Sequence, residues 1–393
     1  MSLAPAISET FRVSRTASRP DQAASPETWN RLAGDVPFRQ WEWLDSWWRH
    51  YRNASAEPFV LTARGDDGEL AGIAPWYLQR SSLRGRVVRA LGSGEVCSDY
   101  VSLLAEDANR QAVARSFAEW LATDGAGSWD LIHLDGIPPD DVATDTLVDE
   151  LAQRGHEIHV RQTISSWRIA LPATWPEYVS QLSRTRRERV KQLSRRVFDA
   201  GRAVSRFATT DAELEQGWRI LVDLHQRRRE SLGQPGCFSS PRFAAFHADA
   251  ARRMFQLGRL RLHWIELDGR PVAVEYALTG GDTVYYYQSG LEPSVIEERP
   301  GWLNLIGSIR AAIDEGYTNF DFLRGDEAYK ASWRGQQVPL REIRIVGRHR
   351  SARWRHRAWL QASSAKRHLR AGLDRLRAKL PGAKPNDSKS DNP

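Results

Sequence analysis

One predicted helix begins with the composition of an anion site, Arg299-Pro300-Gly301-Trp302. It follows an aromatic, β-rich run at 283–288 (TVYYYQ) and continues into apolar residues at helical spacing over 303–313. Proline is preorganised in a first helical turn, and an adjacent glycine lets a ligand approach the backbone N–H groups. A helix start carries roughly half a positive elementary charge and several free donors, which suits a pyrophosphate. Many helices begin with Pro-Gly and bind nothing, so the position directly after a strand is what favours a site.

A second candidate for chemistry is the run FDFLRGDEAYK at 320–330, where a predicted strand opens into a loop. Asp321 alternates with apolar neighbours, so its side chain points away from theirs and is predicted to be buried. A buried carboxylate needs a partner, which Arg324 or Lys330 could supply. A structural ion pair and a role in a site are both open. Side chains that meet a substrate commonly lie at such strand ends, and those that follow this one are Glu327, Tyr329 and Lys330.

The order strand, strand, strand, helix, strand occurs twice in the chain. In the first copy we predict strands at 59–62, 70–78, 99–104 and 129–134 and a helix at 110–122; in the second, strands at 261–266, 272–278, 283–288 and 319–323 and a helix at 301–315. A helix is predicted between the copies over 175–200. When the Asp-Gly turns of the two hairpins are superposed, Glu275 in the second copy falls opposite Ala74 in the first. The first copy therefore lacks this carboxylate, and its helix also lacks the Pro-Gly start. We interpret the second copy as the one that carries chemistry. Two unrelated α/β stretches that share an element order are the alternative.

Length and composition limit the classes of protein to consider. At 393 residues the chain can form two compact units, each with its own core. Its two cysteines, Cys97 and Cys237, lie far apart without partners at metal-ligand spacing, which favours neither a disulfide framework nor a zinc site. We find no secretory signal and no apolar run of the ~18 residues that a spanning helix needs, so a cytoplasmic protein is expected. The net charge of +7 favours anionic partners without choosing among them.

These patterns predict an α/β (α+β) fold in four parts. They are an N-terminal segment at 1–36, a first, degenerate unit at 37–165, a helical arm with the second, catalytic unit at 166–346, and a basic helical tail at 347–393 with a disordered end. Much of the excess positive charge lies in the arm and in the tail.

Several runs in combination resemble a known family. They are LHQRRRESLGQPGCF (224–238), YQSG (287–290), the Arg-Pro-Gly helix start, FDFLRGDEAYK (320–330) and the basic run SRTRRERVKQLSRR (183–196). Together they resemble the acetyltransferase family of the GNAT superfamily that includes the CelD-type cellulose-biosynthesis proteins. The resemblance extends from Pro37 to Val346. It implies two tandem GNAT-like units, an acyl-CoA donor, and a distant similarity to the Fem aminoacyltransferases of peptidoglycan synthesis.

The resemblance also implies a mechanism. In GNAT-like enzymes a backbone N–H of a splayed strand polarises the acyl carbonyl, and one such donor is worth roughly 10²- to 10³-fold in rate. Here that strand ends near Gln288, so the residues predicted to hold acyl-CoA are Gln288, Ser289, Gly290, Arg299, Gly301 and Trp302. Glu275 or Asp321 would take the proton of the acceptor. Tyr329, with Tyr287 as the alternative, would protonate the leaving thiolate.

The predicted function is acyl transfer from acetyl-CoA or another acyl-CoA, without a metal, to an amine or hydroxyl of a small-molecule or glycan-precursor acceptor. An exopolysaccharide or cell-envelope precursor is the expected class. Candidate substrate-binding residues are Arg186, Arg187, Lys191, His225, Arg324, Glu327 and Lys330; a solvated helix face and a structural histidine are the alternatives for the first four. A Fem-like aminoacyl-tRNA-dependent transferase and a scaffold that binds anionic lipid or nucleic acid remain open. We also expect peripheral contact with an acidic inner membrane or a polysaccharide synthase, and no nucleic-acid partner for the enzyme itself.

Overall fold

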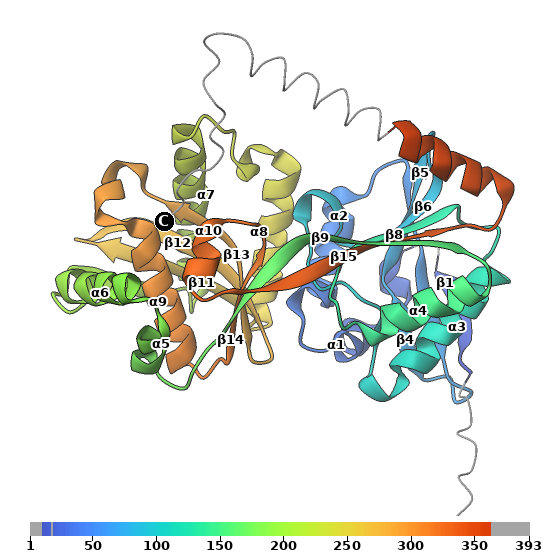
Figure 1. Cartoon of the computed structure of the whole chain (residues 1–393), viewed down its shortest axis with the longest axis horizontal. Helices are drawn as coiled ribbons and strands as arrows, with labels where there is room; N and C mark the ends of the chain where they lie inside the picture. The colour runs from blue at the N-terminus through green and yellow to red at the C-terminus, as the bar shows by residue number, and fades with distance from the viewer. Residues whose placement is uncertain (1–9, 17–18, 363–393) are drawn as a thin grey trace, which may run out of the picture.

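The computed structural model describes residues 10–16 and 19–362, which form two β-sheets with helices on both sides (Figure 1). The larger sheet runs through the whole molecule in the strand order β10 (Ala203–Phe207), β11 (Leu260–Leu267), β12 (Arg270–Gly280), β13 (Thr283–Leu291), β14 (Asn319–Arg324), β9 (Glu157–Ala170), β15 (Gln336–Val346), β8 (Leu131–Ile137), β6 (Gly85–Ala90), β5 (Trp76–Ser81) and β2 (Ala56–Pro58). The smaller sheet has the order β1 (Arg12–Thr16), β3 (Val60–Arg64), β4 (Leu70–Ala74) and β7 (Leu104–Ala105).

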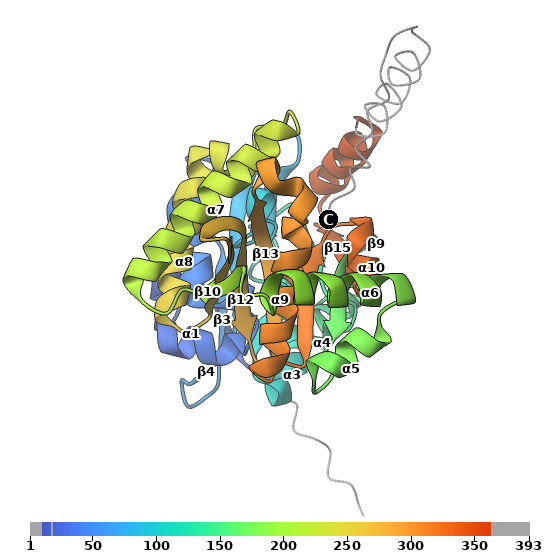
Figure 2. The same cartoon turned by 90° about the vertical axis from the view of Figure 1, so that its left-hand side faces the viewer.

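The helices cover these sheets in two groups. The N-terminal group comprises α1 (Pro26–Ala33), α2 (Trp41–Tyr51), α3 (Arg110–Ala122) and α4 (Val142–Gln153). The C-terminal group comprises α5 (Trp175–Gln181), α6 (Arg184–Leu193), α7 (Asp211–Ser231), α8 (Pro241–Gln256), α9 (Pro300–Asp314) and α10 (Ala328–Ser332). Figure 2 shows that α7 and α8 cover one face of strands β11 to β13 and that α9 covers the other. A last described helix spans 350–362.

The predicted internal repeat is visible in the strand order. In the first unit, which runs from β1 to α4, the strands β1, β3, β4 and β7 lie side by side, and helix α3 leads to β8. In the second unit, which runs from α5 to β14, the strands β10, β11, β12 and β13 lie in the same order, and helix α9 leads to β14. The α+β fold with two units is therefore confirmed.

The two units exchange one strand each. Strand β9 follows the first unit but pairs with β14 of the second, whereas β15 follows the second unit but pairs with β8 of the first. Strands β9 and β15 also pair with each other along most of their length. The predicted boundary between 165 and 166 falls inside β9, and the four-part division stays a prediction. Of the predicted tail, 347–362 is described and the rest lies outside the described residues.

Three local predictions were wrong, each for a local reason. The expected strand at 70–78 is two strands in different sheets, because Pro75 between them has no N–H to donate. Residues 99–103 of the expected strand at 99–104 form a loop, and only Leu104 lies in a strand, β7. Tyr100 in this loop has a φ of 60°. The expected single helix over 175–200 breaks at Leu182, because the Ser183 side chain accepts from the Arg186 N–H and starts α6.

No helix within the described ranges is long and apolar enough to cross a membrane.

Candidate active site

Strands β13 and β14 separate soon after they meet. They pair in parallel only over Thr283–Tyr285. Beyond that point β13 carries a bulge, because Ala277 of β12 pairs with Tyr286 while Tyr276 pairs with Gln288, which leaves Tyr287 as the extra residue. The Ser289 N–H donates at 3.0 Å to the side-chain oxygen of Gln288 rather than to a strand backbone. This N–H is therefore available to another acceptor once the Gln288 side chain rotates, as predicted for a polarising donor.

Arg186 of α6 lies at the start of α9 and has no carboxylate partner among the described residues. Arg299 precedes the helix in the left-handed region with a φ of 56°, and its carbonyl accepts the first helical bonds, from Trp302 and Leu303. The guanidinium of Arg186, from α6, lies over the rings of Trp302 and Trp333, at 4.5 and 5.2 Å from their centroids. Burial lowers the pKa of this arginine, and no carboxylate within the described residues pairs with it.

Unpaired donors around this helix start fit a polyphosphate. The Nη1 of Arg186 and the Nε1 of Trp333 are both buried and have no hydrogen-bond partner among the described residues. Such donors are costly unless an acceptor reaches them, and the oxygens of a pyrophosphate are acceptors. Gly301, in the first turn of α9, is buried beside them. The residues present therefore fit the diphosphate of an acyl-CoA, and Arg186, a predicted substrate-binding residue, lies where it would contact that diphosphate.

Glu275 lies on the α9 side of the sheet and directly opposite Ser289 in the β12–β13 ladder. It is fully buried; Ser308 of α9 donates to its Oε1 at 2.8 Å, and its Oε2 has no partner among the described residues. Arg261 lies 3.9 Å away. Burial raises the pKa of Glu275 to about 7, although Arg261 and Ser308 act in the opposite direction. A carboxylate that titrates near neutral pH, with a free oxygen beside the candidate donor, suits a general base.

Two tyrosines adjoin this carboxylate. The Tyr286 hydroxyl accepts from Asn304 of α9 at 3.4 Å, and the ring packs against Phe320 and Phe322. Tyr329 packs edge-on against Phe322 at 5.7 Å. Burial raises the pKa of both hydroxyls, so both remain protonated at neutral pH, as a proton donor must be. Tyr329 was predicted; Tyr286 was missed, because nothing in the run of three tyrosines distinguishes it from its neighbours.

Asp321 connects the two units through the hydrogen bonds that its carboxylate accepts. Its carboxylate accepts hydrogen bonds from the Tyr100 hydroxyl at 2.5 Å, from Ser166 at 2.6 Å, from Arg168 at 3.0 Å and from the Leu323 N–H at 2.8 Å. A carboxylate offers about four acceptor positions, so these donors occupy them all. The expected partners Arg324 and Lys330 are therefore corrected to Arg168 with two hydroxyls. The arrangement favours the structural alternative, and a base role for Asp321 stays a prediction that these contacts do not support.

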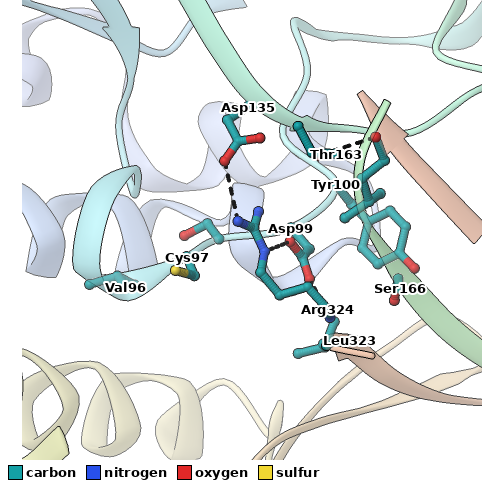
Figure 3. A network of polar contacts seen from close by, with 12 residues as sticks. Val96, Cys97, Asp99, Tyr100, Asp135, Thr163, Ser166, Leu323 and Arg324 are labelled. Carbon is teal, nitrogen blue, oxygen red and sulfur yellow. Dashed lines mark hydrogen bonds and ion pairs between the residues drawn. The ribbon is translucent and has the colours of Figure 1, made fainter. Parts of the chain in front are cut away.

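Arg324 belongs to a second network between the units (Figure 3). Its Nε and backbone N–H donate to Asp99, and its Nη1 donates to Asp135 at 3.2 Å. Burial raises the pKa of Asp99 to about 6, even though Arg324 acts to lower it. The Asp135 side chain is 38% exposed, so its free oxygen faces solvent. The predicted contact of Arg324 with a substrate is therefore indirect at most, through Asp135.

Strained backbone accompanies this network. Cys97, Tyr100 and Leu323 all have a φ between 52° and 60°, a region that residues other than glycine rarely adopt. Such outliers persist where surrounding structure holds them, often near functional sites. No sequence signal marked Asp99 or Asp135, because their partner comes from the other unit.

Lys330 and Glu327 close the end of β14. The Lys330 Nζ donates to the carbonyls of Leu323, Arg324 and Gly325 at 3.1 to 3.3 Å, and it pairs with Glu327 at 2.9 Å. Its side chain is buried, whereas that of Glu327 is half exposed. Lys330 thus satisfies the carbonyls at a strand end, and only Glu327 of this pair is accessible to a substrate.

The opposite face of the sheet carries the remaining predicted residues. The Tyr287 hydroxyl donates to the Val96 carbonyl at 2.7 Å and lies 3.1 Å from His247. It packs against the first unit, away from Glu275, which favours Tyr286 and Tyr329 as proton donors. Gly290 serves packing, because a Cβ there would lie 2.6 Å from the backbone nitrogen of His225 in α7.

His225 itself is fixed against the splayed strand. Its Nδ1 lies 2.8 Å from the Ser289 carbonyl, which can only accept, so this nitrogen carries the proton. Its Nε2 therefore accepts, and the Cys237 Sγ lies 3.2 Å from it. Gln288 donates to the same sulfur at 3.5 Å. Burial lowers the pKa of His225, so the ring is neutral at pH 7 and is a second group able to take a proton beside Ser289.

This arrangement predicts unequal cysteine reactivity. Burial raises the pKa of both thiols, that of Cys237 to about 11. The Cys237 sulfur is also held by His225 and Gln288, whereas Cys97 is exposed. We expect iodoacetamide at pH 8 to alkylate Cys97 at least about tenfold faster than Cys237, because the thiolate is the reactive form and access limits it further. Peptide mass spectrometry after timed quenching measures both rates. In urea the two rates should converge; equal rates in the folded protein would contradict the described Cys237 environment.

The remaining cations of α6 line a separate groove. Arg187 and Lys191, with Arg195, border a cavity of about 410 Å³ whose floor is Trp175, Val179 and Val190. Arg187 also donates to the Leu182 carbonyl at 3.3 Å. Of the three predicted α6 residues, only Arg186 reaches the α9 start. A metal site has no support: no group of three or more His, Cys, Asp or Glu side chains within 10–16 and 19–362 could hold an ion.

Comparison with known proteins agrees with this geometry. Residues 184–331 match the model of the acetyltransferase (GNAT) domain family. The match begins at α6 and ends in α10, so it includes the splayed strand, the α9 start and Glu275. The match supports a GNAT acetyltransferase domain over 184–331, and the protein is an acyltransferase. The predicted enzyme class is confirmed.

Solved structures extend the likeness in fold over most of the chain. FemX is 11% identical with a TM-score of 0.60, over 81% of this chain and 96% of FemX. A conserved protein of unknown function from Bacteroides thetaiotaomicron is 10% identical with a TM-score of 0.54, over 85% and 100% of the two chains. The C-terminal DUF2156 domain of an Agrobacterium fabrum protein is 10% identical with a TM-score of 0.50, over 83% and 92%. No curated protein matches the sequence.

Proposed function

We propose that this acyltransferase takes its acyl group from acyl-CoA, acetyl-CoA first, and transfers it to an amine or hydroxyl. The observation that carries the proposal is the unpaired Arg186 at the start of α9, on the same side of the sheet as Glu275. The GNAT domain match supports a CoA thioester as donor.

Each step of the transfer has a candidate group. Arg186 and the first N–H groups of α9 hold the diphosphate. The Ser289 N–H, released by rotation of Gln288, donates to the acyl carbonyl oxygen as negative charge develops there. Glu275 takes the proton of the attacking amine or hydroxyl, directly or through a water. Tyr329 or Tyr286 donates a hydrogen bond to the departing thiolate. His225, fixed by the Ser289 carbonyl, is the alternative base on the other face.

For the acceptor we propose a glycan or cell-envelope precursor of the kind implied by the CelD-type resemblance. Asp135, whose side chain is 38% exposed beside Arg324, supplies a place for a cationic or hydroxyl-rich acceptor where the two units meet. The similarity of fold to FemX favours a second candidate, an aminoacyl-tRNA-dependent transfer, and the basic α6 helix is compatible with it. Binding of charged tRNA without binding of acyl-CoA would select that candidate.

The donor assignment predicts that Gly301→Asp abolishes acyl-CoA binding. The variant places a carboxylate in the first turn of α9, where the diphosphate should lie, so like-charge repulsion replaces attraction. We expect micromolar affinity for acetyl-CoA in the wild type and at least about a hundredfold loss in the variant by calorimetric titration.

Asn53→Asp is the matched control. Asn53 is exposed beyond α2, and its side-chain oxygen accepts from Ser55, which an aspartate can also do. This variant adds the same charge far from α9 and should bind acetyl-CoA like the wild type. If neither acetyl-CoA nor longer acyl-CoAs bind the wild-type protein, the proposed donor is wrong.

A further inference from the structure

Helix 350–362 is held firmly against the first unit. Ala352 and His356 are buried, and the His356 ring lies 4.8 Å from that of His159 in β9. The Trp359 ring lies under the guanidinium groups of Arg84 and Arg344, at 4.6 and 4.5 Å. Figure 1 shows this helix in red at the edge of the molecule beside β5 and β6. Because one side is fixed by these contacts, the other side faces solvent in a set orientation.

The solvent-facing side presents an aromatic residue between two arginines. Arg350, Trp354 and Arg357 are exposed and are spaced four and three residues apart, so they form one stripe on the helix. Trp354 is 71% exposed, the most of any large apolar side chain among the described residues. Neither arginine of the stripe has an ion pair with a described residue. The stripe therefore presents one large apolar side chain between two cations that are free to contact an anionic partner.

The surroundings of this stripe are basic and partly apolar. Residues 348–357 contain five arginines and no acid, and residues 80–89 contain four arginines and no acid. The two segments adjoin, since a Cβ at Gly85 would lie 2.7 Å from the Arg355 guanidinium. Asp130 lies between them and pairs with Arg86, His349 and Arg355, so it offsets part of this charge but none of that on the stripe. Leu83, in the turn between β5 and β6, is 48% exposed. Burial is the main reason that the pKa of Arg84 falls to about 10; Arg89 and Arg344 lower it further, and Glu342 acts in the opposite direction.

We propose that the helix face formed by Arg350, Trp354 and Arg357 docks the protein on an anionic lipid bilayer. Tryptophan favours the boundary between headgroups and acyl chains, and arginines beside it are drawn to anionic headgroups. Leu83, in the turn beside this helix, is a second exposed apolar side chain. A bilayer can bury apolar side chains, whereas the phosphate backbone of a nucleic acid cannot. The sequence beyond the described residues continues this charge, with seven Lys, Arg or His and one acid over 363–379. This inference does not depend on the proposed acyl donor.

Vesicle binding of the full chain tests the docking face. The probe is vesicles of phosphatidylcholine with about 30 mol % phosphatidylglycerol, compared with vesicles of phosphatidylcholine alone. We expect binding only to the anionic vesicles, weakened by salt. Trp354→Ser and the double variant Arg350→Glu/Arg357→Glu should each lower the partition coefficient about tenfold or more.

Arg270→Glu is the matched control, because Arg270 is an exposed arginine at the start of β12 in the second unit. It should bind vesicles like the wild type, and circular dichroism should show all variants folded. Equal binding to both kinds of vesicle, or unchanged binding by the double variant, would overturn the proposal. Absence of vesicle binding together with retention of tRNA by the same arginines would assign the face to nucleic acid instead.

Discussion

Asp321→Ala is expected to destabilise the protein by about 3–5 kcal/mol, the usual cost of removing one partner from a buried charge pair. The side chain is fully buried and accepts from Tyr100 of the first unit and from Ser166 and Arg168 of β9. Its loss leaves two hydroxyls, one N–H and one guanidinium without their acceptor. Because these groups come from both units, the melting temperature of the whole chain should fall in scanning calorimetry.

Asp314→Ala provides the comparison. Asp314 forms an exposed pair with Arg310 one turn away on α9, at 3.8 Å. Exposed helical pairs contribute a few tenths of a kcal/mol, so this variant should melt within a degree or two of the wild type, at about that level of stability. If Asp321→Ala lowered the melting temperature as little as Asp314→Ala, Asp321 would not hold the units together. It would then again be a candidate general base.

Local signals were sufficient for much of the fold. The predicted helix at 110–122 has those bounds in α3, and the predicted 301–315 differs from α9 by one residue at each end. Apolar spacing and a Pro-Gly start are properties of contiguous residues, so sequence reasoning reaches them. The Asp-Gly turns likewise placed both hairpins. The exchange of β9 and β15 between the units could not be predicted from the sequence. The residues of a strand and its neighbours do not specify which of two similar units the strand will pair with.

The partners of the candidate residues were harder to predict for the same reason. Tyr100 lies 221 positions from Asp321 and Arg168 lies 153 positions from it, so no spacing rule connects them. Arg324, three residues away, looked like the partner but bonds to Asp99 and Asp135 of the first unit.

The tyrosines 285–287 illustrate the limit within one strand. Side chains alternate along a strand, but a bulge shifts the alternation by one residue. Here the bulge at Tyr287 directs Tyr286 toward Asn304 and the α9 side, and it directs Tyr287 and Gln288 toward His247 and Cys237 on the other side. The sequence contains three similar hydroxyls; the register alone decides which one adjoins Glu275.

Glu275→Gln should lower the rate of acyl transfer by roughly 10²- to 10⁴-fold, the usual contribution of a general base. Because burial raises the pKa of Glu275 to about 7, wild-type kcat/KM should rise with pH through that value, and the variant should lose this limb. Release of free CoA thiol, with glucosamine as a first amine acceptor, measures both. Glu315→Gln is the control: Glu315 bonds to the same Arg261 at 3.0 Å but is half exposed, so its loss should leave the pH limb in place.

Glu275→Gln should also be more stable than the wild type above pH 7. An acid whose folded pKa is raised keeps its proton in the folded state while the unfolded chain releases it, so rising pH favours unfolding. For Glu275 this loss of stability begins near pH 4.5 and is complete above about pH 7, where it amounts to roughly 3 kcal/mol. Glutamine does not ionise and escapes the penalty. The melting temperature of Glu275→Gln, compared with that of the wild type, should therefore be higher by more at pH 8 than at pH 5. Its activity should fall at the same time, because the burial that disfavours the charged carboxylate also makes Glu275 a base at neutral pH. A variant that lost stability equally at both pH values would contradict the raised pKa, and one that kept its rate would transfer the base role to His225.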